Sequence, residues 1–324
     1  EIKVYTQRWV VLFLFAFSSF TNAYLWIQFS PIASIAQVYY SVPATAINAL
    51  SLVFMVAYFP GTVLSAWVMD RYGVRFAVVV GSAMGFVCAA VRWLAVFVPV
   101  NAGYKARFCV TLFGQAIGAL AQPFFTNAPS KMSSNWFPVH QRDIATVIAA
   151  MFNPLGNAAG SVIPSIVVSK PDDMPALLAG SMIWAGVITI AVMLWFAEKS
   201  ASGRRLSFDG DDHHGLSSSR KLWLEGVALL KERNFVVLLI GFSVGLGVFN
   251  ALLTLIAQIV APCGYDSGHA GLFGGVLLGC GLLGAAIAGP LMEATHAYVE
   301  LLKGGIIFAV CGAVFFLLML KEHN

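Results

Sequence analysis

Charge is what this sequence has least of. Only 10% of its 324 residues are Asp, Glu, Lys or Arg, whereas a soluble domain has about 25%. Apolar residues make up 59% of the chain, above the roughly 45–50% of a soluble domain. This composition excludes a disordered chain and argues against a soluble enzyme. The net charge of +4 is too small to indicate a nucleic-acid-binding surface.

Paired cysteines and recognisable catalytic motifs are also lacking. The five cysteines show no CxxC or CxxH spacing, so the sequence predicts neither a disulfide framework nor a metal site. There is no glycine-rich phosphate loop, which argues against an ATP-driven pump. No nucleophile stands with a matching base, so we expect no enzyme activity and no cofactor.

Long apolar runs dominate what is present. A helix needs about 20 mostly apolar residues to cross the hydrocarbon core of a bilayer. Nine stretches meet this requirement: 8–30, 44–68, 76–98, 106–128, 143–167, 176–197, 234–260, 269–291 and 301–320. Backbone groups in lipid must satisfy their own hydrogen bonds, so these stretches should be helices. The sequence predicts an all-α integral membrane protein with about nine transmembrane helices.

One polar segment divides these helices into two groups. We expect a six-helix bundle in residues 1–197, a cytoplasmic linker in 198–233 and three helices of a second bundle in 234–324. Within the linker, residues 220–233 favour an amphipathic helix at the membrane surface. This organisation is typical of two-bundle transporters.

The basic residues indicate an orientation. Most of the 19 Lys and Arg residues fall in segments on the same side as the N-terminus, which predicts a cytoplasmic N-terminus. No retention motif is visible, so we expect the plasma membrane.

A segment that begins at Gly61 has a counterpart later in the chain. Gly61 lies nine residues before Asp70, and Gly284 lies nine residues before Glu293. This shared spacing favours two homologous bundles. The two copies suggest a cytoplasmic gate, in which Asp70 pairs with an arginine or faces a helix N-terminus in one conformer only. The gate candidates are Gly61, Asp70, Arg71, Gly73, Arg75 and Glu293. An ordinary loop turn is the alternative.

The first copy also carries a family resemblance. GTVLSAWVMDRYGVR (61–75) resembles the signature loop of the major facilitator superfamily. Three further blocks resemble the feline leukaemia virus subgroup C receptor-related (FLVCR-like) family: RWVVLFLFAFSSFTNAYLWIQF (8–29), GQAIGALAQPFFTNAPSKMSSNWFP (114–138) and FNPLGNAAGSVIP (152–164). That family consists of twelve-helix transporters, and its founding members are implicated in choline and ethanolamine transport and, earlier, in haem export.

The resemblance implies a major facilitator fold of two helical bundles. It also implies that the second bundle is incomplete here, as in a truncated gene model or a fragment. A complete member is expected to be a monomer in the lipid bilayer.

Polar and aromatic residues at mid-span are the candidate substrate contacts, because such transporters bind substrate between their bundles near the bilayer midplane. They are Asn22, Trp26, Gln28, Gln122, Asn153, Asn157, Phe249 and Asn250. Trp26 stands out, since an indole face attracts quaternary ammonium groups and the resemblance implies a substrate-contacting tryptophan there. Any single Asn or Gln could instead bond only a neighbouring helix.

Two positions differ from those of the family's choline transporters. Pro154 stands in place of a glutamine, and Asn250 in place of a tyrosine. Choline and ethanolamine remain the leading examples of a small organic substrate, but another amine or a different polar solute stays open.

The predicted function is therefore transport of a small organic solute by alternating access. No acidic residue lies at mid-span, which favours facilitated, uncoupled transport. No histidine lies at mid-span either, so haem export is less favoured. We expect Arg92 to extend toward the outer surface, or else to serve an outer-gate ion pair or an anion. The alternative is a truncated or receptor-like membrane protein without transport activity.

Overall fold

The computed structural model describes residues 7–99, 105–196, 228–295 and 298–322, and within these ranges the chain forms helices and no strands. Most of the expected linker and of its amphipathic helix at 220–233 lies outside the described residues.

Eight helices of the described ranges are long and apolar enough to cross a membrane. Before the linker these are α1 (Gln7–Ile27), α3 (Ala44–Leu94), α4 (Ala106–Thr126), α6 (Val139–Val167) and α7 (Met174–Trp195). After it come α9 (Arg233–Val260), α10 (Ser267–Thr295) and α11 (Tyr298–Glu322). The short helices α2 (Ala33–Tyr40), α5 (Pro129–Trp136), η1 (Ala95–Phe97), η3 (Pro171–Asp173) and η4 (Ala261–Cys263) lie in the connections.

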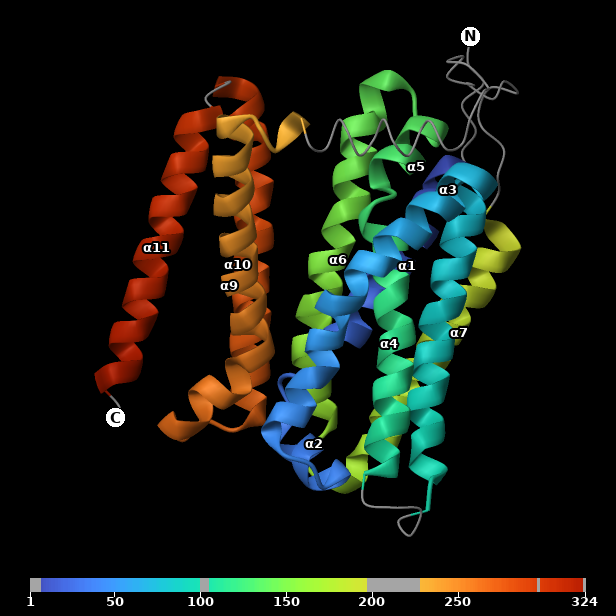
Figure 1. Cartoon of the computed structure of the whole chain (residues 1–324), viewed down its shortest axis with the longest axis vertical. Helices are drawn as coiled ribbons and strands as arrows, with labels where there is room; N and C mark the ends of the chain where they lie inside the picture. Colours follow the sequence, from blue (N-terminus) through green and yellow to red (C-terminus); the bar gives the residue numbers. More distant parts are fainter. Residues whose placement is uncertain (1–6, 100–104, 197–227, 296–297, 323–324) are drawn as a thin grey trace.

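The long helix α3 contains two of the predicted spans. Its 51 residues are interrupted at Gly73, where φ is 84° and ψ is 172°. This combination is essentially restricted to glycine, because a side chain would clash with the backbone. The chain reverses there, so that the two halves of α3 run in opposite directions (Figure 1). The eight helices therefore correspond to the nine predicted spans.

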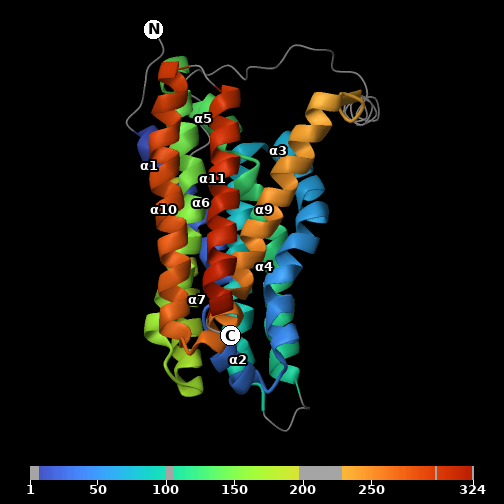
Figure 2. The same ribbon diagram turned by 90° about the vertical axis from the view of Figure 1, so that its left-hand side faces the viewer.

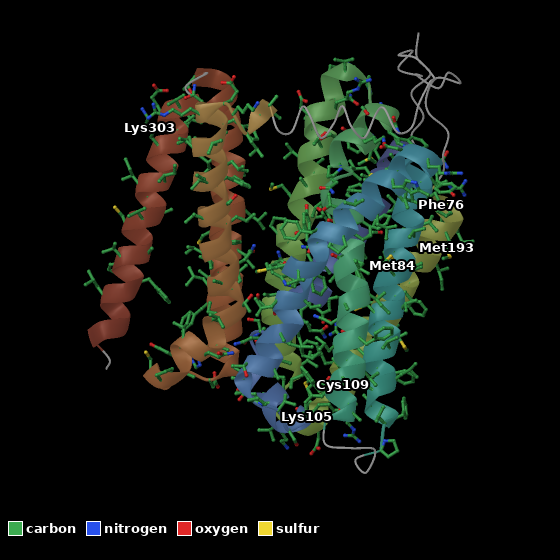
Figure 3. The ribbon with its side chains drawn as sticks, in the orientation of Figure 1. Phe76, Met84, Lys105, Cys109, Met193 and Lys303 are labelled. Atoms are coloured by element: carbon green, nitrogen blue, oxygen red, sulfur yellow. The ribbon has the colours of Figure 1, made fainter. Side chains whose placement is uncertain are left out.

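Two ends of the molecule can be named from this turn. The Asp70 end is where α3 reverses and α9 begins, and the Asn48 end carries α2 and the connection between α9 and α10 (Figure 1). Phe76 and Lys303 lie toward the Asp70 end, whereas Lys105 and Cys109 lie at the Asn48 end (Figure 3).

The helices before the linker pack around α1, whose most apolar window is 72% buried. Small residues permit the close contact between α1 and α6. A Cβ atom on Gly156 would lie 2.9 Å from the Phe20 carbonyl carbon, and one on Gly160 would lie 2.9 Å from the Tyr24 carbonyl oxygen. Glycine is a common residue at such interfaces, because lipid-embedded helices associate by close packing.

The helices after the linker attach to this bundle mainly through α10, which packs along α6. By contrast, the large apolar side chains of α9 between Val237 and Val248 are exposed, and so are most of those that the structure describes on α11. Figure 2 shows α9 leaning away from α10 toward the Asp70 end. The two groups of helices therefore meet near the Asn48 end.

Candidate substrate cavity

A cavity of about 750 Å³ lies between the two groups of helices. Six helices supply its walls: α1, α3, α4 and α6 from the first group, and α9 and α10 from the second. Its volume falls within the range of roughly 300–1,000 Å³ that is usual for small-molecule sites.

Aromatic rings form one part of the wall. Trp26 lies in the last turn of α1 and is only 5% exposed. Its indole nitrogen donates a hydrogen bond to the Ser51 carbonyl oxygen at 3.2 Å, which fixes the ring. The ring of Phe54 lies 6.4 Å away, centroid to centroid, at a tilt of 37°. Tyr58 and Phe249 also line the cavity, so aromatic residues of α1, α3 and α9 contribute to its wall.

Side-chain amides form the polar part of the wall. They belong to Gln122, Asn153, Asn157 and Asn250. The Oδ1 atom of Asn157 is buried and has no hydrogen-bond partner. A buried acceptor without a partner costs free energy, so this atom favours a ligand or water that can donate a hydrogen bond.

Formal charge is missing from this wall. Among the described residues, no Asp, Glu, Lys, Arg or His lines the cavity. An anion would find no cationic partner there, whereas a cation could rest on the ring faces and the amide oxygens. A neutral polar solute could use the same amides.

Hydrogen bonds between the two groups of helices close the cavity at the Asn48 end. The Ser30 hydroxyl is shared between the carbonyl oxygens of Leu253 and Thr254, at 2.5 and 2.7 Å. The amides of Asn48 and Gln258 exchange two hydrogen bonds, of 3.3 and 2.6 Å. The sequence did not reveal Ser30 or Asn48 as functional candidates, because their partners lie more than 200 residues away.

Close packing of α6 and α10 completes this closure. A Cβ atom on Gly271 would lie 2.6 Å from the Ser161 carbonyl oxygen, and one on Gly274 would lie 3.1 Å from the Ser161 side chain. Toward the Asp70 end, the cavity reaches Tyr58 and Thr126, whose side-chain oxygens are 3.1 Å apart and exposed. The cavity is therefore shut at the Asn48 end and open toward the Asp70 end.

The comparisons with known proteins agree with this architecture. Residues 10–323 match the family model described as Major Facilitator Superfamily. The chain belongs to the major facilitator superfamily. The crystal structure of a D-xylose-proton symporter has the same fold, with a TM-score of 0.58 at 12% identity over 89% of this chain and 68% of that one.

Relatives within this superfamily are more similar in sequence. Solute carrier family 49 member A3 of Xenopus tropicalis is 29% identical over 99% of this chain and 66% of its own length. Choline/ethanolamine transporter FLVCR2 of Homo sapiens is 30% identical over 97% of this chain and 60% of its own length. The predicted resemblance to the FLVCR-like family is thus confirmed, and the chain spans 60–66% of these two relatives.

Six of the eight residues expected at the substrate site line the cavity of this major facilitator chain: Trp26, Gln122, Asn153, Asn157, Phe249 and Asn250. The other two lie within the first bundle. Asn22 is 1% exposed, donates a hydrogen bond to the Gly118 oxygen at 2.9 Å and borders a separate void of about 10 Å³. Gln28 donates to the Ser181 hydroxyl at 2.8 Å and accepts a hydrogen bond from Arg92.

The expected outward path of Arg92 is wrong. Its side chain is completely buried, and neither ion pair of the described residues includes it. The guanidinium donates to the Leu25 carbonyl oxygen at 3.2 Å and lies 4.6 Å from the centroid of the Phe29 ring. Arg92 remains inside because the end of α1 supplies acceptors that the sequence did not reveal.

Two gate candidates at the Asp70 end, Asp70 and Arg71, make their contacts within the first bundle. Asp70 pairs with Lys131 of α5 at 2.7 Å, rather than with an arginine. Arg71 lies 5.8 Å from the ring centroids of Trp67 and Tyr72. Exposure of the paired charges makes this contact weak.

The remaining gate candidates have mainly local roles in the structure. A Cβ atom on Gly61 would lie 3.0 Å from the Pro123 side chain, so Gly61 permits close packing of α3 on α4. Gly73 makes the turn within α3, Arg75 is exposed, and the side chain of Glu293 lies outside the described residues. The gate therefore stays a prediction.

Proposed function

We propose that the cavity binds a small organic amine, with choline and ethanolamine as the leading examples, and that the protein moves it across the membrane by alternating access. The observation that carries the proposal is an uncharged cavity with the Trp26 ring in its wall. A desolvated cation over an aromatic face gains about 2 kcal/mol. A homologue at 30% identity is named a choline/ethanolamine transporter, which supports the same substrate class.

The chemistry of the wall favours an amine over the other substrates considered. An organic anion would lose its hydration without gaining a cationic partner. Haem could find a thioether or phenol ligand in Met55, Met151 or Tyr58, but its propionate groups would meet no cationic side chain among the described lining residues. Among the described residues, the lining has no carboxylate or imidazole that could relay a proton, so we propose facilitated, uncoupled transport.

The proposal also includes which end of the molecule faces the cytoplasm. With the N-terminus in the cytoplasm, the Asp70 end faces the cytoplasm and the cavity is open to that side. The conformation is then inward-facing, and the contacts of Ser30, Asn48 and Gln258 form the closed outer side. We propose the plasma membrane as the location and a monomer as the working unit.

Binding by the purified chain tests the substrate. Choline or ethanolamine is expected to raise the melting temperature, because a ligand of the folded state stabilises it. Trp26→Ala should abolish the shift, and Trp26→Phe, which keeps an aromatic face, should retain part of it. Trp195→Ala is the matched control, since this side chain is 59% exposed and does not line the cavity.

Three results would count against the proposal. A shift with citrate alone would refute an amine site, and a choline shift that survives in Trp26→Ala would refute the role of the indole. Should Trp26→Ala not fold, Phe249→Ala removes another aromatic ring of the cavity, on α9 of the second group of helices, and should reduce the choline shift. Binding without choline flux in reconstituted liposomes would favour the receptor-like, non-transporting alternative.

A further inference from the structure

The helix that carries Trp26 ends inside the protein. α1 stops at Ile27, and a non-helical segment, residues 28–32, leads to α2. Every residue from 21 to 33 is buried, so this helix end has little access to bulk water. Trp26 lies one residue before the end, and its orientation therefore depends on how the end is held.

A buried helix end requires hydrogen-bond donors. The last carbonyl groups of a helix have no partner within it, and lipid cannot supply one. The Leu25 oxygen accepts hydrogen bonds from Arg92 at 3.2 Å and from Gln115 at 3.3 Å. Gln115 also reaches the Trp26 oxygen at 3.4 Å. The Ile27 oxygen accepts from the backbone N–H of Ser30 at 2.9 Å.

The same contacts accommodate the charge of Arg92. The C-terminal end of a helix carries a partial negative charge that favours a cation. The Phe29 ring lies 4.6 Å from the guanidinium carbon, and an aromatic face also attracts a cation. The Gln28 side-chain oxygen accepts a further hydrogen bond from Arg92. Helix end, ring and amide thus take the place of a carboxylate partner.

We propose that Arg92 is a positioning residue for the cavity: it caps the buried end of α1 and thereby sets the orientation of Trp26. Two anchors then hold the tryptophan. Its backbone is fixed through the carbonyl oxygens at the helix end, and its indole is fixed by the Ser51 oxygen on α3. The consequence for amine affinity rests on the proposed function, whereas the positioning itself does not.

Arginine suits this position better than lysine does. The planar guanidinium presents several N–H groups in a fixed fork and stacks on rings. Its two terminal nitrogens reach the Leu25 oxygen and the Gln28 oxygen at the same time. A lysine would keep the charge but concentrate it on one nitrogen, so Arg92→Lys should restore only part of the arrangement.

The environment of Trp26 tests the proposal without a ligand. The purified chain is labelled with 5-fluorotryptophan, and the Trp26 fluorine resonance is assigned by its loss in Trp26→Phe. Arg92→Met should shift, split or broaden this resonance while those of Trp67 and Trp195 stay in place. In Arg92→Lys, the Trp26 resonance should change less than in Arg92→Met, but it should still differ from that of the parent.

A matched control separates positioning from general packing. Thr189→Val removes another buried hydrogen bond of the first bundle, from Thr189 to the Ser82 oxygen, and should leave the Trp26 resonance unchanged. An unchanged resonance in both Arg92 variants would overturn the proposal. So would an equal change of all tryptophan resonances, because it would indicate only a loss of structure. If Arg92→Met does not fold, the Trp26 resonance is measured in Arg92→Lys instead. Gln115→Met then tests whether loss of the other donor to the end of α1 also shifts it.

Amine affinity supplies a second, separate readout. Arg92→Lys should raise the dissociation constant for choline by about tenfold, the lower end of the loss seen when a group that orients a metal ligand is removed. The same substitution should have little effect in the Trp26→Phe background, because Arg92 acts through Trp26. Failure of the parent chain to bind any amine would refute the proposed function, and the fluorine spectra would still decide the role of Arg92.

Discussion

Gly271 offers a direct test of how the cavity is closed. Alanine there would place a Cβ atom 2.6 Å from the Ser161 carbonyl oxygen. The nearby Ser165 hydroxyl can rotate away, but the Ser165 Cβ atom, 2.5 Å from the same position, and the Ser161 carbonyl oxygen are both fixed by the backbone of α6. The helices α6 and α10 would have to separate by several tenths of an ångström, which weakens the contact at the Asn48 end.

The magnitude follows from a matched substitution on the same helix. Gly279 has no atom within 4 Å of its Cβ position, so Gly279→Ala reports only the helix propensity gain of about 1 kcal/mol. Gly271→Ala makes the same gain and adds an overpacking cost of about 1–3 kcal/mol. The ratio of closed to open molecules should therefore differ between the two variants by roughly 5- to 150-fold.

Cysteine labelling measures this ratio. Thr254 is buried between the two groups of helices, and Thr254→Cys, in a background without the native cysteines, places a thiol there. A water-soluble maleimide should modify it faster in Gly271→Ala than in Gly279→Ala by the predicted factor. Equal rates would show that the contact of α6 with α10 does not hold the cavity closed, and the reasoning from Gly271 would be wrong.

Three further outcomes follow from single contacts. Asn48→Ala and Gln258→Ala should each speed the same labelling reaction, and the double variant should add little, because the two amides form one pair worth about 1–2 kcal/mol. Gly73→Ala should lower the free energy of unfolding by about 1–3 kcal/mol in chemical denaturation, since its backbone conformation is strained for alanine. The backbone N–H and the ring of His269 hold the pKa of the Asp266 carboxyl below its ordinary value. The melting-temperature advantage of the parent over Asp266→Ala should therefore be complete at neutral pH and disappear as the pH falls through that lowered pKa.

The length of each apolar run was sufficient to predict the membrane helices. The two spans 44–68 and 76–98 were separated correctly by the polar residues around Gly73, even though the structure joins them as α3. Pro154 did not interrupt α6, because a single missing hydrogen bond is tolerated in a packed membrane helix. The six residues that line the cavity could be selected from the sequence because polar side chains within a membrane span are rare and usually face the interior of the bundle. Their contact with a substrate stays a prediction.

The end of α1 and the role of Arg92 were not predictable in the same way. The apolar pattern continues through residue 30, so the span was expected to extend beyond Ile27. An early end requires donors from Arg92 and Gln115, which lie on helices far away in the sequence. Ser30 and Asn48 were missed for the same reason. The composition of one span does not show which residues of another span face it.

The chemistry of the closed side has a consequence for the electrical behaviour of the protein. A gate that carries one elementary charge across the whole membrane field gains or loses about 2.3 kcal/mol per 100 mV. The contacts at the Asn48 end that would part in the proposed alternating-access cycle involve a hydroxyl, two amides and a surface of glycine and serine, none of which carries formal charge. Parting these contacts should therefore proceed at the same rate in polarised and depolarised membranes. If the protein carries an amine cation, as proposed, the charge of that substrate would then supply the voltage dependence of net transport.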